Sequence, residues 1–307
     1  MKKFSFIFRL IGVFLFIYFL INVDFEKTFN VIKHLNIKIF FICIFLTFFS
    51  IIFRVLRMKI FINKVNPNNH KVSIFELYLI YFTGLFFGSV TPSKVGELVK
   101  IRYLKKFGNK EAFYIVFADR LWDAFFILFF AGMSFYFLGF EKYFYIGLTV
   151  SIILFSIIFI FYKIGILKKF KKYIPKKISK FIGTEYYKYS IKEIISLSFY
   201  TIISFIMYFI WYYLLMYMLG IFIPAFKVFW IQSITVFVNI LPISVMGLGT
   251  REAINLHFFK EFGYNNENVM AFGFVIMFFY IINIVSGFLF WNLLEHIIKR
   301  RPEFYEV

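Results

Sequence analysis

The chain has 307 residues, of which 62% are hydrophobic and 25% aromatic, and its formal net charge is +19. A soluble core of this length cannot bury that much apolar surface, so the composition excludes an ordinary soluble domain and predicts an integral membrane protein. The charge alone would fit a nucleic-acid partner, but the basic residues form short clusters between long apolar runs rather than one basic face. The single cysteine, Cys43, excludes a disulfide framework within the chain and a cysteine-based metal site.

Apolar runs long enough to cross the hydrocarbon core predict the membrane spans. They occupy residues 4–22, 37–62, 111–139, 143–162, 193–219 and 268–298. The fold class is therefore predicted as an all-α integral membrane protein, one polytopic domain over residues 1–307 with about six transmembrane helices. No small-residue cleavage site follows the first run, which is predicted to stay as a helix rather than to act as a signal peptide. The mixed stretch 24–36 is predicted to form an interfacial helix.

Two further apolar runs, at residues 74–90 and 228–241, are interrupted and then followed by short, more polar segments. Neither second segment is long or apolar enough to be another full span. Each run is therefore predicted to be a re-entrant hairpin, in which a helix enters, breaks near mid-membrane and a shorter helix returns to the same side. The predicted helix-breaking residues are Pro92, Gly96, Pro242, Gly247 and Gly249.

The distribution of basic residues predicts the orientation of the chain. Segments 1–9, 54–71, 94–110, 163–192 and 299–301 fall on one side if both interrupted runs are hairpins, and they hold 27 of the 35 lysines and arginines. Such a bias marks the cytoplasmic side. We therefore predict a multi-pass protein of the cytoplasmic (cell) membrane with both termini in the cytoplasm. Segment 163–192 is predicted to be a basic cytoplasmic connector that lies on anionic headgroups.

The two interrupted segments resemble each other. Each has a proline, then glycine and glutamate, and ten residues after that glutamate each has Phe-Gly. Three predicted spans separate them, so they would open to opposite sides, as in an inverted repeat with halves at roughly 73–140 and 224–298. In transporters, interrupted helices at matching positions of such a repeat indicate a substrate site near the midplane. Chance similarity in a phenylalanine-rich membrane sequence is the alternative.

Ionisable side chains at membrane depth cost several kcal/mol unless they are paired or hydrated, so those near the breaks are candidate site residues. The predicted substrate-binding residues are Lys94, Glu97, Arg102, Asp119, Arg120, Asp123, Arg251 and Glu252. The basic members would bind a phosphate headgroup, while the acidic members would orient them and could carry protons. Salt bridges that only pin the hairpins together are the alternative. Arg54 and Arg57 are interpreted as topology signals, and neither a metal site nor a cofactor motif is expected.

Three of these motifs carry a family resemblance. They are Pro92 with Gly96-Glu97, Asp119-Arg120 with Asp123, and the Gly-Leu-Gly-x-Arg-Glu block at residues 247–252. With them, nearly the whole chain resembles the lysylphosphatidylglycerol synthase transmembrane region, also called the flippase-like domain. The resemblance implies a lipid-handling membrane domain. In the bifunctional synthases of the family this part moves aminoacylated phospholipid across the bilayer, and a separate soluble domain attaches the amino acid. No such domain follows the last predicted span here, so aminoacyl transfer is not expected.

The leading hypothesis is a flippase-like protein that moves an anionic or modified lipid, either a phospholipid or a polyprenyl-phosphate-linked lipid, through a polar cavity at the midplane. One alternative is a membrane-embedded glycosyl- or aminoacyl-lipid transferase, with a glutamate or aspartate as general base. Another is a non-catalytic partner subunit. The expected partners are membrane lipids, with a homo-oligomer or a separate lipid-modifying enzyme also open, and no nucleic acid.

Overall fold

The computed structural model describes residues 21, 24–33, 35–67, 72–140, 143–149, 152–153, 156, 189–240 and 247–300, and within these it contains helices and no strand. Three of the helices are long and apolar enough to cross a membrane, namely α3 (Ile37–Val65), α10 (Ile191–Met218) and α13 (Asn266–Lys299). The all-α membrane class is thereby confirmed. The predicted spans 4–22 and 143–162 and the connector 163–192 lie wholly or largely outside the described residues, so the count of six spans stays a prediction.

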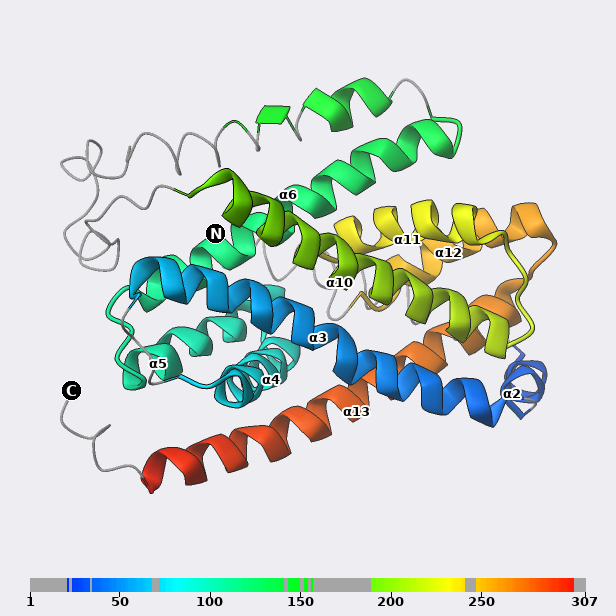
Figure 1. Cartoon of the computed structure of the whole chain (residues 1–307). Coiled ribbons are helices and arrows are strands. Elements are labelled where there is room, and N and C mark those ends of the chain that lie inside the picture. The colour runs from blue at the N-terminus through cyan, green and yellow to red at the C-terminus, as the bar shows by residue number, and fades with distance from the viewer. Residues whose placement is uncertain are drawn as a thin grey trace, which may run out of the picture.

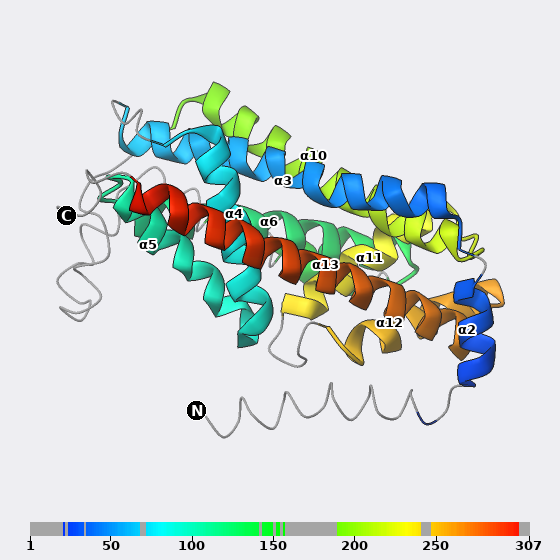
Figure 2. The ribbon, with the colours of Figure 1, turned by 90° about the horizontal axis from the view of Figure 1, so that it is seen from below.

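The long helices begin where the sequence supplies N-caps. The Asn36 side chain accepts backbone N–H groups at the start of α3, and Ser190 with Glu193 forms a capping box at the start of α10. Lys64, near the end of α3, pairs with Glu193 at 3.0 Å, so the two helices run antiparallel. Figures 1 and 2 show α3 and α10 side by side along their length, with α13 packed across them. These three helices form the frame of the molecule.

The first interrupted segment folds as helix, break and helix. Helix α4 (Ile74–Val90) ends before Pro92, and η1 (Pro92–Leu98) and α5 (Val99–Lys106) turn back and pack against α4. The Thr91 hydroxyl fixes the turn because it donates to the Phe87 carbonyl and accepts from the Gly96 N–H, both at 2.7 Å. A Cβ at Gly96 would lie 2.0 Å from that carbonyl oxygen, so only glycine allows this approach.

The second interrupted segment has the same plan. Helix α11 (Ala225–Ile240) ends before the break, and α12 (Thr250–Phe259) with η3 (Lys260–Phe262) packs back against it. Gly247 and Gly249 have φ of +77° and +79°, which favours glycine over any residue with a side chain. Pro242 lies outside the described residues. In the described residues each interrupted segment consists of two separate helices, whereas the helix-breaking role of the individual residues, re-entry into a membrane and the inverted repeat stay predictions.

Each interrupted segment has a hydrophobic core of its own. One core holds Leu79, Leu104 and Ile115 beside α4 and α5, and the other holds Ile231 and Phe259 beside α11 and α12. Tyr208 on α10 is the one partly buried residue of the described chain that packs against both cores. In Figure 1 the α4–α5 pair lies towards one end of the frame and the α11–α12 pair towards the other. Helix α2 (Phe25–Lys33) corresponds to the predicted helix at 24–36, and α6 (Ala112–Phe137) to the predicted span at 111–139. Residues 143–149 are helical as well.

A polar clamp holds α5 to the end of α13. The Tyr103 hydroxyl donates to Glu295 Oε1 at 2.5 Å and accepts from Trp291 Nε1 at 2.7 Å. Lys106 Nζ lies 3.8 Å from the other oxygen of Glu295. The clamp ties the returning helix of the first segment to the frame.

We expect Tyr103→Phe to lower the free energy of unfolding by about 1–2 kcal/mol, because both hydrogen bonds are lost while the ring is kept. Unfolding in detergent would be followed by the reaction of Cys43, the only cysteine and fully buried, with a fluorogenic maleimide during heating. Tyr217→Phe is the matched control, since this tyrosine is 46% exposed. Equal unfolding midpoints for Tyr103→Phe and the wild type would contradict the clamp.

Candidate functional site

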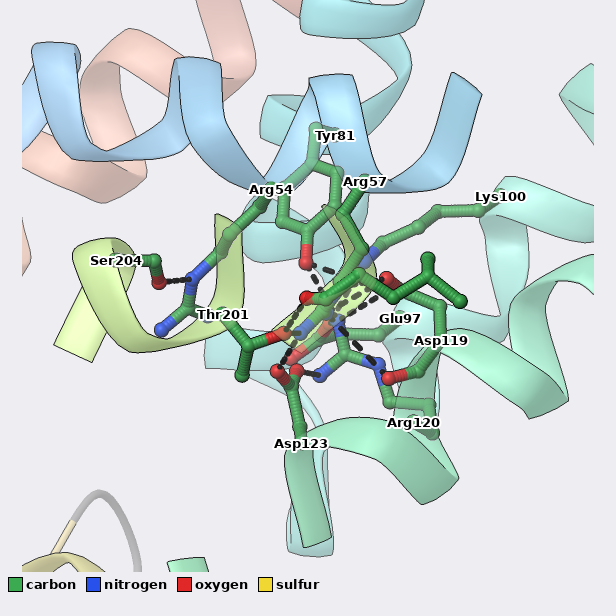
Figure 3. Close-up of polar contacts among 11 residues, drawn as sticks. Arg54, Arg57, Tyr81, Glu97, Lys100, Asp119, Arg120, Asp123, Thr201 and Ser204 are labelled. Atoms are coloured by element: carbon green, nitrogen blue, oxygen red, sulfur yellow. Dashed lines mark hydrogen bonds and ion pairs between the residues drawn. The ribbon is translucent and has the colours of Figure 1, made fainter. Parts of the chain in front are cut away.

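A fully buried arginine on α3 is at the centre of the site. Arg57 donates from Nε to Asp119 Oδ1 at 2.8 Å and from Nη1 to Asp123 Oδ1 at 2.6 Å. Nη1 also donates to the Thr201 hydroxyl on α10 at 3.0 Å. The two carboxylates lie one turn apart on the same face of α6, so one guanidinium reaches both. Figure 3 shows this arrangement, which joins three helices through one cation.

The first interrupted segment contributes its glutamate to the same group. Glu97 Oε2 lies 2.7 Å from Arg120 Nη2 and 3.0 Å from Lys100 Nζ. Arg120 also lies 3.6 Å from Asp119 and 3.8 Å from Asp123. The turn after α4 is therefore tied through Arg120 to α6, and the carboxylates of both elements share their cations.

Small residues on α4 make room for these side chains. The space that a Cβ at Gly84 would need is filled by the Lys100 chain, with Cε only 2.2 Å away. At Gly88 the same space is filled by Glu97, with Cγ at 2.6 Å. Lys100 Nζ then lies 3.8 Å from the centre of the Tyr81 ring, within the range of a cation–π contact. The glycines of α4 thus let two charged side chains lie against a helix that is otherwise apolar.

We call this group the α6 charge cluster. It comprises Arg54, Arg57, Glu97, Lys100, Asp119, Arg120 and Asp123. Four cations against three carboxylates leave one formal positive charge in excess. Arg120 is its most accessible ion-paired member, with 31% of the side chain exposed, whereas Arg57, Lys100 and Asp119 are fully buried. The excess charge and the access through Arg120 favour an anionic ligand over a cation.

The second interrupted segment carries a separate pair. Arg251 Nε donates to Glu252 Oε1 at 3.0 Å, and Nη2 donates to the same oxygen at 2.5 Å and to the Gly273 carbonyl at 3.4 Å. The other oxygen of Glu252 accepts the Gly249 N–H at 2.7 Å, which caps α12. A Cβ at Gly273 would lie 2.8 Å from Glu252, so this glutamate also rests on a helix glycine, as Glu97 does on Gly88.

Both segments share one further feature. Each glutamate forms an ion pair with an arginine, and each arginine has one buried nitrogen with no acceptor among the described residues: Nε of Arg120 and Nη1 of Arg251. Most buried donors in folded proteins are paired, so an unpaired one needs an explanation. An anionic oxygen from a ligand is the acceptor that a guanidinium prefers.

The structure brings together four of the predicted site residues, Glu97, Asp119, Arg120 and Asp123, in the α6 charge cluster. Arg251 and Glu252 form the second pair and have no ion pair with that cluster in the described residues. Arg102 is exposed on α5 and lies outside both groups. The side chains of Pro92 and Lys94 lie outside what the structure describes.

Two members of the α6 charge cluster, Arg54 and Arg57, were misinterpreted from the sequence, and a third, Lys100, was missed. Arg57 was interpreted as a topology signal, and this is wrong, because the side chain is fully buried and pairs with two carboxylates. Its position inside the apolar run 37–62 was the available signal, since an arginine within a span faces the protein interior. Arg54 is half-buried and bonded to Ser204 rather than placed at a free surface. Lys100 has no such signal, because it belongs to a short basic segment that looks solvated.

Comparison with known proteins gives one match. A family model described as "Lysylphosphatidylglycerol synthase TM region" matches residues 6–287, which is most of the chain. No curated protein matches significantly, and no solved structure does.

Proposed function

Because this chain belongs to the lysylphosphatidylglycerol synthase transmembrane-region family, and its function is thus related to membrane lipid, we propose that it is a flippase-like lipid translocase. Its cargo would be an anionic or modified lipid, either a phospholipid or a polyprenyl-phosphate-linked lipid. The observation that supports this most is the matched pair of arginines, Arg120 and Arg251. Each is paired with the glutamate of an interrupted segment, and in the part of the chain that the structure describes each has a buried nitrogen without an acceptor, which an anionic oxygen could fill.

The two arginines lie in different halves of the molecule, so a headgroup phosphate would meet one and then the other. The acyl or prenyl tails would stay in the bilayer while the headgroup crosses through protein. Under this proposal the two interrupted segments are re-entrant hairpins that open to opposite sides, and rocking of one repeat against the other gives alternating access. Residues 163–192 would lie at the cytoplasmic surface, together with both termini.

The test is lipid translocation in proteoliposomes that contain fluorescent phosphatidylglycerol. Glu97→Gln and Arg251→Ala should each lower the rate about 10- to 100-fold, because a hydrogen bond to a charged group contributes about 1.5–3 kcal/mol. Lys110→Gln and Lys260→Gln are matched controls, since both lysines are exposed beside the same two segments. Each variant would first be shown, by Cys43 reactivity, to remain folded at the temperature of the transport assay.

Unchanged rates in both Glu97→Gln and Arg251→Ala would show that these residues are not the site. The wild-type protein could instead move no lipid but form a glycosyl- or aminoacyl-lipid from donor and acceptor in detergent. This result would favour a transferase over a translocase.

A further inference from the structure

A row of hydroxyl groups runs along one face of α10. Thr201, Ser204, Tyr208 and Tyr212 follow one another at intervals of three or four residues, which places them on the same side of the helix. Thr201 accepts from Arg57 and Ser204 from Arg54, each at 3.0 Å. The Tyr208 hydroxyl donates to the Tyr212 hydroxyl at 3.0 Å. We call these four residues the α10 hydroxyl row.

The α10 hydroxyl row extends from one charged group to the other. At one end, Thr201 and Ser204 contact the α6 charge cluster. In the middle, Tyr208 packs against both hydrophobic cores. At the other end, the Tyr212 ring lies 5.9 Å from the Phe272 ring, next to Gly273, whose carbonyl accepts from Arg251. Polar side chains therefore connect the two arginine–glutamate sites through a stretch of the bundle that is otherwise apolar.

Arg54 is the one cation of the α6 charge cluster that forms no ion pair within 4.0 Å in the described residues. Its Nε donates to Ser204 at 3.0 Å. Arg57, Lys100 and Arg120 each have at least one carboxylate within ion-pair distance. In Figure 3 the Arg54 guanidinium lies beside Ser204, apart from the carboxylates that surround Arg57 and Arg120.

An unpaired arginine in an apolar helix is costly, so it indicates a functional group rather than a structural one. Its two Nη groups present the geometry that binds two oxygens of a phosphate at once. The hydroxyl of Ser204 lies on the adjoining face of α10 and, because it accepts from Arg54, is able to donate its own proton to a further phosphate oxygen. The chemistry of this position therefore fits a phosphate mono- or diester.

We propose that Arg54 and the α10 hydroxyl row form an intermediate binding site for the phosphate of the lipid headgroup, between the sites at Arg120 and Arg251. This inference rests on the proposed function for the identity of the lipid. It adds a third position, with residues that neither the motifs nor the family match assign. A phosphate that moves between Arg120 and Arg251 would bind Arg54 on the way. The headgroup would then cross the apolar interior in two short steps instead of one long one.

Binding in detergent tests the site without requiring transport. Phosphatidylglycerol with short acyl chains would be titrated into the purified protein by calorimetry, with diacylglycerol of the same chain length and inorganic phosphate as separate arms. We expect Arg54→Gln to weaken phosphatidylglycerol binding about tenfold and Arg54→Lys to weaken it less, since lysine keeps the charge but not the two-pronged geometry. Lys59→Gln on the same helix is the matched control.

Equal affinity of wild type and Arg54→Gln for phosphatidylglycerol would overturn the site. Equal binding of diacylglycerol would also overturn it, because the phosphate would then be irrelevant. If inorganic phosphate binds with the same affinity as phosphatidylglycerol, the site is not specific for a lipid headgroup, and that assignment is wrong. If Arg54→Gln does not fold, Tyr208→Phe carries the test, since it removes one hydroxyl of the row and keeps the ring that packs against both cores.

Transport is then measured on the same variants, so that the two proposals fail separately. If Arg54→Gln loses phosphatidylglycerol binding and the wild type moves no lipid, the phosphate site is supported and the translocase proposal is wrong. If the wild type moves lipid and Arg54→Gln equals it in both binding affinity and transport rate, the intermediate site is wrong and the translocase proposal is supported.

Discussion

We expect Arg57→Leu to lower the free energy of unfolding by about 3–5 kcal/mol, the usual cost of leaving buried charges without their partner. Leucine would remove the guanidinium that hydrogen-bonds both Asp119 and Asp123, and it would leave these carboxylates only the longer ion pairs to Arg120 at 3.6 and 3.8 Å. Both carboxylates are almost completely buried, so water cannot replace the lost guanidinium. The midpoint of heat-induced Cys43 labelling in detergent measures the effect, because this thiol reacts only when its surroundings unfold.

Two further variants make that prediction specific. The triple variant Arg57→Leu, Asp119→Asn and Asp123→Asn should recover a large part of the loss, because neutral amides need no counter-ion. Arg102→Leu removes an exposed arginine and should leave the labelling midpoint within the scatter of the wild type. A midpoint for Arg57→Leu that equals that of Arg102→Leu would show that the buried ion pairs do not hold the three helices together.

The second large effect is expected at the turn of the first interrupted segment. Gly96→Ala would place a methyl group 2.0 Å from the Phe87 carbonyl oxygen and 2.5 Å from the Thr91 hydroxyl, and backbone cannot move away as a flexible side chain can. The hydrogen bond from the Gly96 N–H to Thr91 would be broken as the turn opens. We expect the free energy of unfolding to fall by about 3 kcal/mol, which is the upper end of the usual cost of overpacking. We also expect the adjacent Glu97 to be displaced.

Gly220→Ala is the control for this prediction. Gly220 has a φ of +73° and no atom within 4 Å of the added methyl group, so it measures backbone strain without a clash. We expect Gly220→Ala to lower the free energy of unfolding by only about 1 kcal/mol. If Gly96→Ala costs no more than Gly220→Ala, the close approach at the turn is not what fixes its shape.

The helices were predictable because hydropathy and capping residues act locally. The predicted spans 37–62, 193–219 and 268–298 differ from α3, α10 and α13 by three residues or fewer at each end. The N-caps at Ser190 and Asn265 explain the earlier start of α10 and α13, because each begins its helix two residues before the predicted span. The breaks were also predictable, because the effects of proline and glycine on the backbone do not depend on their neighbours. Pro92 restricts the backbone and cannot donate a hydrogen bond, whereas Gly96, Gly247 and Gly249 allow conformations that other residues avoid.

The composition of the site was not predictable to the same degree. Glu97, Asp119, Arg120 and Asp123 were found because a charged side chain in an apolar run stands out in the sequence. Which cation each carboxylate would meet depends on how α3, α6 and α10 pack, and local sequence carries no information about that. Arg57 was therefore misinterpreted, Lys100 was missed, and Arg251 with Glu252 was expected in the same cavity as residues from which the structure separates it.

The length of α13 has a consequence for the clamp at Tyr103. This helix has 34 residues, which corresponds to about 51 Å at the standard rise per residue. Even at a steep tilt of about 40° it would span roughly 39 Å along the membrane normal, against a hydrocarbon thickness of about 30 Å. Under the proposed topology, α13 extends beyond the hydrocarbon at its cytoplasmic end, and Glu295 lies within its last two turns. The hydrogen bonds that hold α5 are then expected at the depth of the lipid headgroups, which would anchor the returning helix of the first segment beside the phosphates of the surrounding bilayer.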